Sequence, residues 1–152
     1  MVEISIRPIT LPIYGLDLLR QESSDEGYKF IERLVGEWNQ RTNRFDQPGE
    51  VLLGLFQMTR LVGLGGLNRD PYTTDRGVGR IRHVYVTVSS RRQGLGETLV
   101  RSLLDRSQTS FAAVRLRTDN PAATRLYENL GFIRIDDPTA SHVFVHGVRP
   151  IG

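Results

Sequence analysis

Apolar residues recur along this chain with two different periods, and each period predicts one type of element. In VEISIRPI (residues 2–9) apolar and polar positions alternate, which is typical of a strand. Apolar residues three and four positions apart predict two helices, over residues 11–22 and 25–40. One face of the second helix is apolar and carries Phe30, Ile31, Leu34, Val35 and Trp38.

The middle of the chain is rich in aliphatic residues and predicts three strands. The segments EVLLGLFQ (50–57) and RLVGLGGL (60–67) predict a hairpin across Met58 and Thr59. The glycines of the second segment indicate a bulge or the close approach of another backbone. Proline, aspartate and glycine mark residues 68–79 as a loop, and RIRHVYVTV (80–88) predicts the next strand.

The second half of the chain predicts two more helices among three strands. A leucine stripe indicates a helix that ends near Gln108, and Asn120 with Pro121 marks the start of another. The expected elements are this first helix, a strand over 112–118, a helix over 120–131, and closing strands over 132–135 and 142–148. This order indicates an α/β fold in a single domain over residues 1–152.

Composition narrows the chemistry that such a domain can perform. The chain has 152 residues, of which 39% are hydrophobic, as is ordinary for one globular domain. It has no cysteine, which excludes disulfides, a thiolate nucleophile and a thiolate metal site. His83, His142 and His146 are spaced poorly for metal ligands, so no metal is expected.

The charge pattern favours small anionic partners over membranes and nucleic acids. No apolar run reaches the roughly 18–20 residues of a membrane span, and no signal-peptide pattern is present, so we expect a cytoplasmic protein. The formal net charge is +3, and Lys29 is the only lysine, so almost every cation is a guanidinium suited to phosphate or carboxylate. Because charges of both signs are interspersed and 8% of residues are aromatic, no nucleic-acid partner is expected.

The segment SSRRQGLGETLV (89–100) lies between a predicted strand and a predicted helix. Such a glycine-bearing turn leaves backbone N–H groups pointing one way, with the positive end of the helix dipole behind them. Gly94 and Gly96 leave the backbone open to a pyrophosphate, and Arg91 and Arg92 can reach its outer oxygens. Packing alone also accounts for such a turn. The segment has neither the P-loop pattern nor the dinucleotide-binding fingerprint.

Two segments of the chain resemble the GNAT superfamily of N-acetyltransferases. VYVTVSSRRQGLGETLV (84–100) is similar to the acyl-CoA-binding pattern Arg/Gln-x-x-Gly-x-Gly/Ala after a strand. NPAATRLYENLGF (120–132) is similar to the later pattern, at Asn120, Ala123, Leu126, Tyr127, Gly131 and Phe132. The resemblance extends over essentially the whole chain. It implies the GNAT fold, with a mixed, mostly antiparallel sheet of about six to seven strands, splayed between the fourth and fifth and flanked by about four helices.

The resemblance also implies an activity, the transfer of an acetyl group from acetyl-CoA directly to an amine. Backbone groups of Val86 to Val88 would bind the pantetheine arm like an added strand, and the turn before the helix would hold the pyrophosphate. The residues that would bind acetyl-CoA are Val86, Thr87, Val88, Arg91, Arg92, Gln93, Gly94, Leu95, Gly96, Glu97, Asn120 and Tyr127.

Tyr127 receives the main catalytic role from the resemblance. Its hydroxyl would point at the thioester sulfur, as the general acid for the departing thiolate or as a hydrogen-bond donor to it. A backbone N–H near Val86 would stabilise charge on the carbonyl oxygen. The alternatives are a helix tyrosine packed on the core and, for Asn120, a simple helix N-cap.

The general base is where this sequence departs from the family pattern. Some members carry a glutamate six residues before the position of Val86, and others one five before that of Asn120. This chain has Arg80 and Arg115 there, and neither can accept a proton.

Four other residues remain as candidates for the base, directly or through water: His83, Asp119, Asp70 and Asp75. His83 has the most suitable ordinary pKa. Strand alternation, however, places His83 on the face opposite Arg82, Val84 and Val86, which favours a structural histidine.

Acceptor recognition is predicted at the loop over residues 68–79 and on the strand that follows. Asp70, Tyr72 and Asp75 could attract a cationic amine, unless the loop is only a solvated turn. Arg80 and Arg82 could instead select an acceptor that carries a carboxylate.

A second class of function stays open, a non-catalytic acyl-CoA-binding module. The missing glutamates favour it and Tyr127 opposes it. The acceptor amine is not identified: a small amine, an antibiotic, an amino acid, a peptide N-terminus or a protein lysine all remain. The protein is expected to be a monomer or a homodimer.

Overall fold

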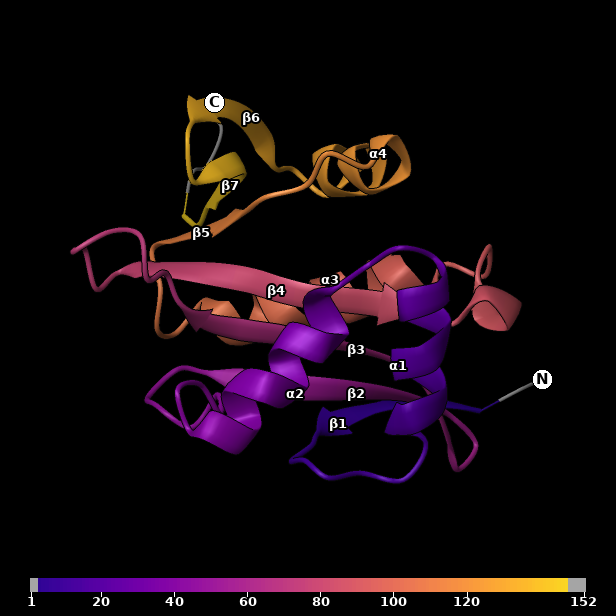
Figure 1. Ribbon diagram of the computed structural model, residues 1–152. Helices are drawn as coiled ribbons and strands as arrows, with labels where there is room; N and C mark the ends of the chain where they lie inside the picture. The colour runs from indigo at the N-terminus through magenta and orange to yellow at the C-terminus, as the bar shows by residue number, and fades with distance from the viewer. Residues whose placement is uncertain (1–2, 148–152) are drawn as a thin grey trace.

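One seven-stranded sheet runs through residues 3–147, the part of the chain that the computed structural model describes (Figure 1). The strands are β1 (Ile4–Pro8), β2 (Val51–Gln57), β3 (Arg60–Arg69), β4 (Val78–Val86), β5 (Ala113–Leu116), β6 (Ile133–Asp137) and β7 (Ala140–Val145). The helices are α1 (Leu16–Asp25), α2 (Phe30–Gln40), α3 (Leu95–Ser107) and α4 (Pro121–Asn129), with a short 3-10 helix η1 (Val88–Ser90).

Each element expected from the apolar periods is present, in the expected order, but several boundaries differ. Helix α1 begins at Leu16, after Gly15 in the left-handed conformation with φ 94°. Helix α2 begins at Phe30 rather than at residue 25, because Gly27, with φ 90°, separates it from α1. Val2 and Val148, at the outer ends of the first and last expected strands, lie outside the described residues.

The sheet opens between β4 and β5, as expected. The strand order is β1-β2-β3-β4-β5-β7-β6, and β4–β5 is the parallel pair among antiparallel neighbours. β4 pairs with β5 only over Val78 to Arg80, opposite Ala113 to Arg115. From Ile81 to Val86, therefore, the edge of β4 that faces β5 has no strand beside it.

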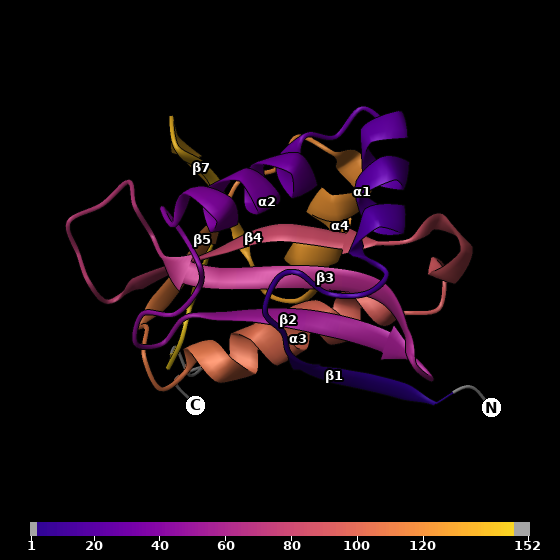
Figure 2. The same cartoon turned by 60° about the horizontal axis from the view of Figure 1, so that its bottom comes forward.

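Helices cover both faces of the sheet (Figures 1 and 2). Helices α1 and α2 pack on one face, in an apolar cluster that includes Leu19, Leu34 and Leu64. Helix α3 packs on the other face with Leu99 and Leu103, and α4 joins that second cluster through Tyr127. Within residues 3–147, no helix has the length and apolar character that crossing a bilayer requires.

A bulge at His83 reverses the alternation of side chains along β4. The register against β3 shifts between the pairs Leu64–Tyr85 and Gly66–Arg82, and His83 has a left-handed φ of 62°. An extra residue in one strand moves every later side chain to the other face.

The bulge corrects the expected placement of His83. Arg82 meets Glu37 of α2, and the ring of His83 meets that of Phe45, so both lie on the α1–α2 face. Val84 and Val86 pack on the α3 side instead. The prediction that His83 lies opposite Arg82 was wrong, because it assumed an unbroken alternation.

The glycine-rich strand β3 carries a bulge, one of the two expected alternatives, because its register against β2 shifts between the pairs Leu55–Gly63 and Phe56–Leu61. Gly66 makes room for a side chain rather than for another backbone. A Cβ at Gly66 would lie 2.7 Å from Cζ of Phe45, whose ring is wedged against the sheet. Gly66→Ala should therefore lower the free energy of unfolding by about 1–3 kcal/mol.

A glycine in open space provides the matched control. Gly36 lies within α2, and a Cβ there would meet no atom within 4 Å. Gly36→Ala should raise the free energy of unfolding by about 0.5–1 kcal/mol. Urea denaturation of both variants measures the two effects, and a Gly66→Ala protein as stable as the wild type would show that the contact with Phe45 is not tight.

Candidate active site

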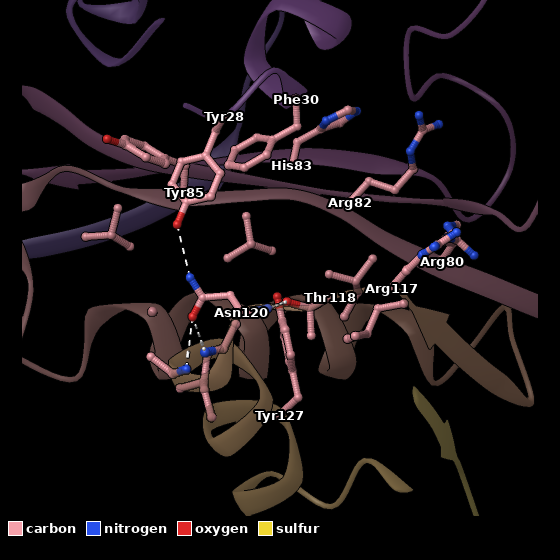
Figure 3. A pocket seen from close by; sticks show the side chains of 18 of the residues that line it. Tyr28, Phe30, Arg80, Arg82, His83, Tyr85, Arg117, Thr118, Asn120 and Tyr127 are labelled. Carbon is pink, nitrogen blue, oxygen red and sulfur yellow. Dashed lines mark hydrogen bonds between the residues drawn. The ribbon is translucent and has the colours of Figure 1, made fainter. Parts of the chain in front are cut away.

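A cavity of about 960 Å³ lies where β4 and β5 separate. It is lined by β4, the turn before α3, the start of α2, the segment after β5, α4 and the β6–β7 turn, as Figure 3 shows for part of it. The predicted site residues that line it are Tyr72, Arg80, Arg82, His83, Val86, Arg91, Arg92, Gly94, Leu95, Gly96, Glu97, Asn120 and Tyr127. Those that do not are Asp70, Asp75, Thr87, Val88, Gln93 and Asp119.

The N-terminus of α3 offers unpaired backbone donors to this cavity. Gly94 precedes the helix with φ 75°, and no side chain caps it. The first bond of the helix runs from the N–H of Thr98 to the carbonyl of Gly94, so the N–H groups of the first turn have no helical acceptor. A Cβ at Gly94 would meet nothing within 4 Å, and one at Gly96 would meet only Val86 and Leu126, at 4.0 Å. The turn is therefore an open site for an anion.

Arg91 is engaged away from that turn. Its guanidinium makes two hydrogen bonds to Glu26, at 2.9 and 2.7 Å, and its Nε donates to the carbonyl of Val86 at 2.9 Å. The hydrogen bonds to Glu26 raise the pKa of Arg91. Arg92 lines the cavity, while the side-chain amide of Gln93 accepts a hydrogen bond from Gln57 at 3.2 Å. Of the two arginines, Arg91 is paired with a carboxylate, and Arg92 has no ion pair within residues 3–147.

The end of β4 is tied to α1 by a carboxylate. Glu22 accepts hydrogen bonds from the hydroxyls of Tyr85 and Thr87 and from the N–H of Val88. The N–H of Thr87 bonds back to Val62 of β3. Thr87 and Val88 are thus already paired, and backbone alternation turns the N–H of Val86 toward the open edge of β4.

Tyr85 stands between two carboxylates. Burial raises its pKa, and its hydrogen bonds to Glu26 and Glu22 raise it further, so the hydroxyl remains a donor. Burial alone would raise the pKa of Glu22, but the hydrogen bonds from Tyr85, Val88 and Thr87 outweigh it and lower that pKa. Glu22 and Glu26 are therefore fixed anions that orient β4 and Arg91.

Asn120 is both a helix cap and a bridge across the cavity. Its Oδ1 accepts from the N–H groups of Ala122 and Ala123, which satisfies the first turn of α4. Its Nδ2 donates to the hydroxyl of Tyr28 at 3.0 Å, which links α4 to the segment between α1 and α2 (Figure 3). The helix-cap interpretation of Asn120 is thus confirmed, and its role toward pantetheine stays a prediction.

Tyr127 rises from α4 into the cavity, beside Thr118 (Figure 3). Its ring packs edge-on against Phe132, with centroids 5.5 Å apart. Burial raises the pKa of Tyr127, so its hydroxyl keeps its proton at neutral pH. The residue combines both interpretations, a packed ring and a hydroxyl directed at the cavity.

His83 is buried against the cavity with no partner for its ring. It is 7% exposed, and neither Nδ1 nor Nε2 has a hydrogen-bond partner within residues 3–147. Burial lowers its pKa to about 3, and the like charges of Arg82 and Arg33 lower it as well. At neutral pH the ring is therefore neutral and a weak base.

The predicted acidic candidates lie elsewhere. The carboxylate of Asp70 is fully buried, 3.6 Å from Arg80 and 3.3 Å from Arg115, and it accepts from the N–H of Tyr72. Asp75 caps its own loop through the N–H of Gly77. Asp119 is exposed. None of these three carboxylates lines the cavity. Asp70 is paired with arginines, and Asp75 is bound to the backbone of its own loop.

Sequence reasoning missed Glu22, Glu26 and Tyr28. Glu22 was visible only as the last position of the first predicted helix, and Glu26 and Tyr28 as positions in the first turn of the second. Their partners lie 59 to 92 residues away along the chain. A local sequence pattern cannot predict contacts between residues so far apart in the chain. No cluster of three or more potential metal ligands occurs in the described range.

Comparison with known proteins identifies the family of this chain. The sequence pattern described as the acetyltransferase (GNAT) family matches residues 16–132. The N-alpha-acetyltransferase RimI of Mycobacterium tuberculosis is 32% identical over 79 residues, which cover 49% of this chain and 47% of that protein. The match thus spans about half the length of that relative.

Solved structures share the fold. A protein from Exiguobacterium sp. 255-15, described as a candidate acetyltransferase, has a TM-score of 0.84 at 23% identity, covering 94% of this chain and 93% of that one. YncA from Salmonella typhimurium, also described as a candidate acetyltransferase and solved with its cofactor acetyl-CoA, has a TM-score of 0.66 at 14% identity, covering 92% and 89%. At these identities the likeness concerns the fold.

The depressed pKa of His83 predicts a pH dependence of stability. Between the ordinary pKa of 6.5 and about 3, the unfolded chain binds a proton on His83 that the folded chain does not. Stability should therefore fall as the pH falls below about 6.5. From pH 7 to pH 5 the wild type should lose about 2 kcal/mol more than His83→Asn, since asparagine tolerates the left-handed φ and does not titrate there. Urea unfolding at both pH values measures this, and equal losses would contradict a buried neutral ring.

Proposed function

The chain belongs to the acetyltransferase (GNAT) family, and on that premise we propose that it transfers an acetyl group from acetyl-CoA directly to the nitrogen of an amine acceptor. One observation carries the proposal: the uncapped N-terminus of α3, the open edge of β4 and the hydroxyl of Tyr127 share one cavity. The match to an N-alpha-acetyltransferase over half the chain supports nitrogen as the acceptor atom.

The residues present fit acetyl-CoA. The first-turn N–H groups of α3 and the positive end of its dipole suit a pyrophosphate, and Arg92 adds a charge beside them. The open space at Gly94 and Gly96 leaves room for phosphate oxygens against the backbone. That YncA, which has the same fold, was solved with acetyl-CoA supports this co-substrate. When bound, acetyl-CoA supplies the acetyl group as a thioester.

The open edge of β4 is suited to an extended chain of amides. The carbonyl of Val86 already accepts from Arg91, so the N–H of Val86 is the free backbone donor at this point. We propose that this N–H binds the thioester carbonyl oxygen, which gains negative charge during acetyl transfer. Stabilisation of such a charge by fixed donors is usually the largest single contribution to catalysis. Asn120, fixed by its cap and by Tyr28, borders the same path.

Tyr127 has the properties of an acid for the departing thiolate. Burial keeps its hydroxyl protonated, and Phe132 holds the ring in place. Donation of this proton, or of a hydrogen bond, offsets the charge on the leaving sulfur.

The described lining contains one carboxylate, Glu97, and it lies at the α3 end. His83 is too weak a base to hold the proton of an amine. We therefore propose that the amine loses its proton to water in the open cavity. The remaining rate enhancement comes from positioning, for which well-aligned groups contribute about 7–11 kcal/mol.

Tyr127→Phe tests this role. The variant should lower kcat by about 100-fold, because a positioned acid contributes at least that much. The Kd for acetyl-CoA should stay within about twofold of the wild type, since the hydroxyl acts on the leaving group. Release of free thiol from acetyl-CoA with an amine panel measures kcat, and calorimetry measures binding.

Tyr14→Phe is the matched control, because Tyr14 is 97% exposed and lies outside the cavity. An unchanged kcat in Tyr127→Phe would remove the acid role. Tight binding of acetyl-CoA without thiol release for any amine would instead favour the non-catalytic module.

A further inference from the structure

The two ends of the cavity differ in chemistry. Gly94 to Glu97 form one end, with backbone donors and the start of α3. Figure 3 shows Arg80, Arg82 and Arg117 gathered at the other end, beyond Tyr127. If acetyl-CoA occupies the first end, the acceptor amine reaches the thioester from the second.

The second end is lined by guanidinium groups from three separate parts of the chain. Arg33 comes from α2, Arg80 and Arg82 from β4, and Arg117 from the segment after β5. No carboxylate among the described residues lines this end. Four cations around one opening repel one another unless an anion lies among them.

Internal carboxylates account for only part of this charge. Asp70 lies beneath the cavity, shared between Arg80 and Arg115, and Arg82 meets Glu37 at 3.4 Å. Arg33 and Arg117 have no carboxylate within 4 Å in residues 3–147. Among the described residues, the side chain of Arg117 bonds only a backbone carbonyl, that of Pro138 at 3.1 Å. These two guanidiniums are thus free to bind an anion at the mouth of the cavity.

A second observation indicates a polar ligand at the same end. The ring of His83 is buried, lines the cavity and has both nitrogens without partners in the described structure. It lies near Arg82 and Arg33, whose charges act on it. Buried polar atoms without a partner are uncommon in folded proteins, and a bound ligand is one way to satisfy them.

We propose that the acceptor is a small amine that also carries an anionic group, a carboxylate or a phosphate, which Arg33, Arg82 and Arg117 bind while its amine lies toward Tyr127. This inference rests on the proposed function and names the acceptor class for that site. Guanidinium groups bind both anions through paired N–H donors. The hydrogen-bonding ring of His83 meets the polar part of the same molecule.

Matched amines test the proposal in the wild type. 4-Aminobutanoate is compared with 4-aminobutanamide, and O-phosphoethanolamine with ethanolamine, by thiol release from acetyl-CoA. In at least one pair the anionic amine should have a kcat/KM about tenfold or more above its neutral partner. The pair with the larger ratio identifies the anion as carboxylate or phosphate.

Variants of the two unpaired arginines locate the anion. Arg33→Gln and Arg117→Gln leave no carboxylate orphaned, so both should fold, which circular dichroism checks. Each should raise the KM for the preferred anionic amine by about tenfold and leave the KM for acetyl-CoA unchanged. Arg60→Gln, at an exposed position outside the cavity, is the control and should change neither value.

The outcomes separate the two proposals. Thiol release that is equally fast with neutral and anionic amines, or a preference that survives both substitutions, would overturn the acceptor class and leave acetyl transfer standing. Binding of acetyl-CoA with no thiol release for any amine would overturn the proposed function, and this inference with it.

Discussion

The parallel pairing of β4 with β5 ends after three residues, and the site depends on that interruption. Had the ladder continued, β5 would cover the edge from Ile81 to Val86, and the backbone donor at Val86 would be spent on the sheet. A free strand edge normally invites pairing with another extended chain. Here the edge lines a cavity to which α3 and α4 also contribute, and there it offers free backbone groups. The fold thus leaves an unpaired strand edge inside a cavity.

Charged groups from distant parts of the chain hold that edge in place. Glu22 of α1 and Glu26, the residue that follows this helix, bind Tyr85, Arg91 and the backbone after β4. The turn before α3 is therefore oriented by residues about 65 positions earlier in the chain. The hydrogen bonds outweigh the cost of burying Glu22, as its lowered pKa indicates. At the other end of the cavity, arginines line the wall and no carboxylate of the described residues does. This end is therefore positively charged and has no carboxylate to act as a base. The two ends of the cavity therefore differ in chemistry, with backbone donors at one and guanidiniums at the other.

Local patterns predicted the elements and brought most of the residues at the α3 end of the cavity together. The arrangement of charges at the other end depended on contacts between separate strands, which local patterns do not show. The apolar periods identified the elements because burial of one helix or strand face leaves a regular trace in sequence. The glycine turn and Tyr127 were found from spacing within one segment each. The prediction of His83 opposite Val84 and Val86 was confirmed, but its position relative to Arg82 was wrong, since the bulge depends on the register against β3 and has no local signature at a histidine. Asp70 was expected to attract an amine, but its burial beneath Arg80 and Arg115 follows from contacts across the sheet.

Amide NMR tests whether the open edge of β4 and the first turn of α3 bind acetyl-CoA. On titration with acetyl-CoA, the backbone signals of Val86 and of residues 95–97 should shift and become protected from exchange, while those of β1 stay unchanged. Gly96→Leu, which fills the gap between Val86 and Leu126, should abolish the shifts without unfolding the protein. If acetyl-CoA binds and the signals of Val86 and residues 95–97 do not shift, acetyl-CoA occupies another site.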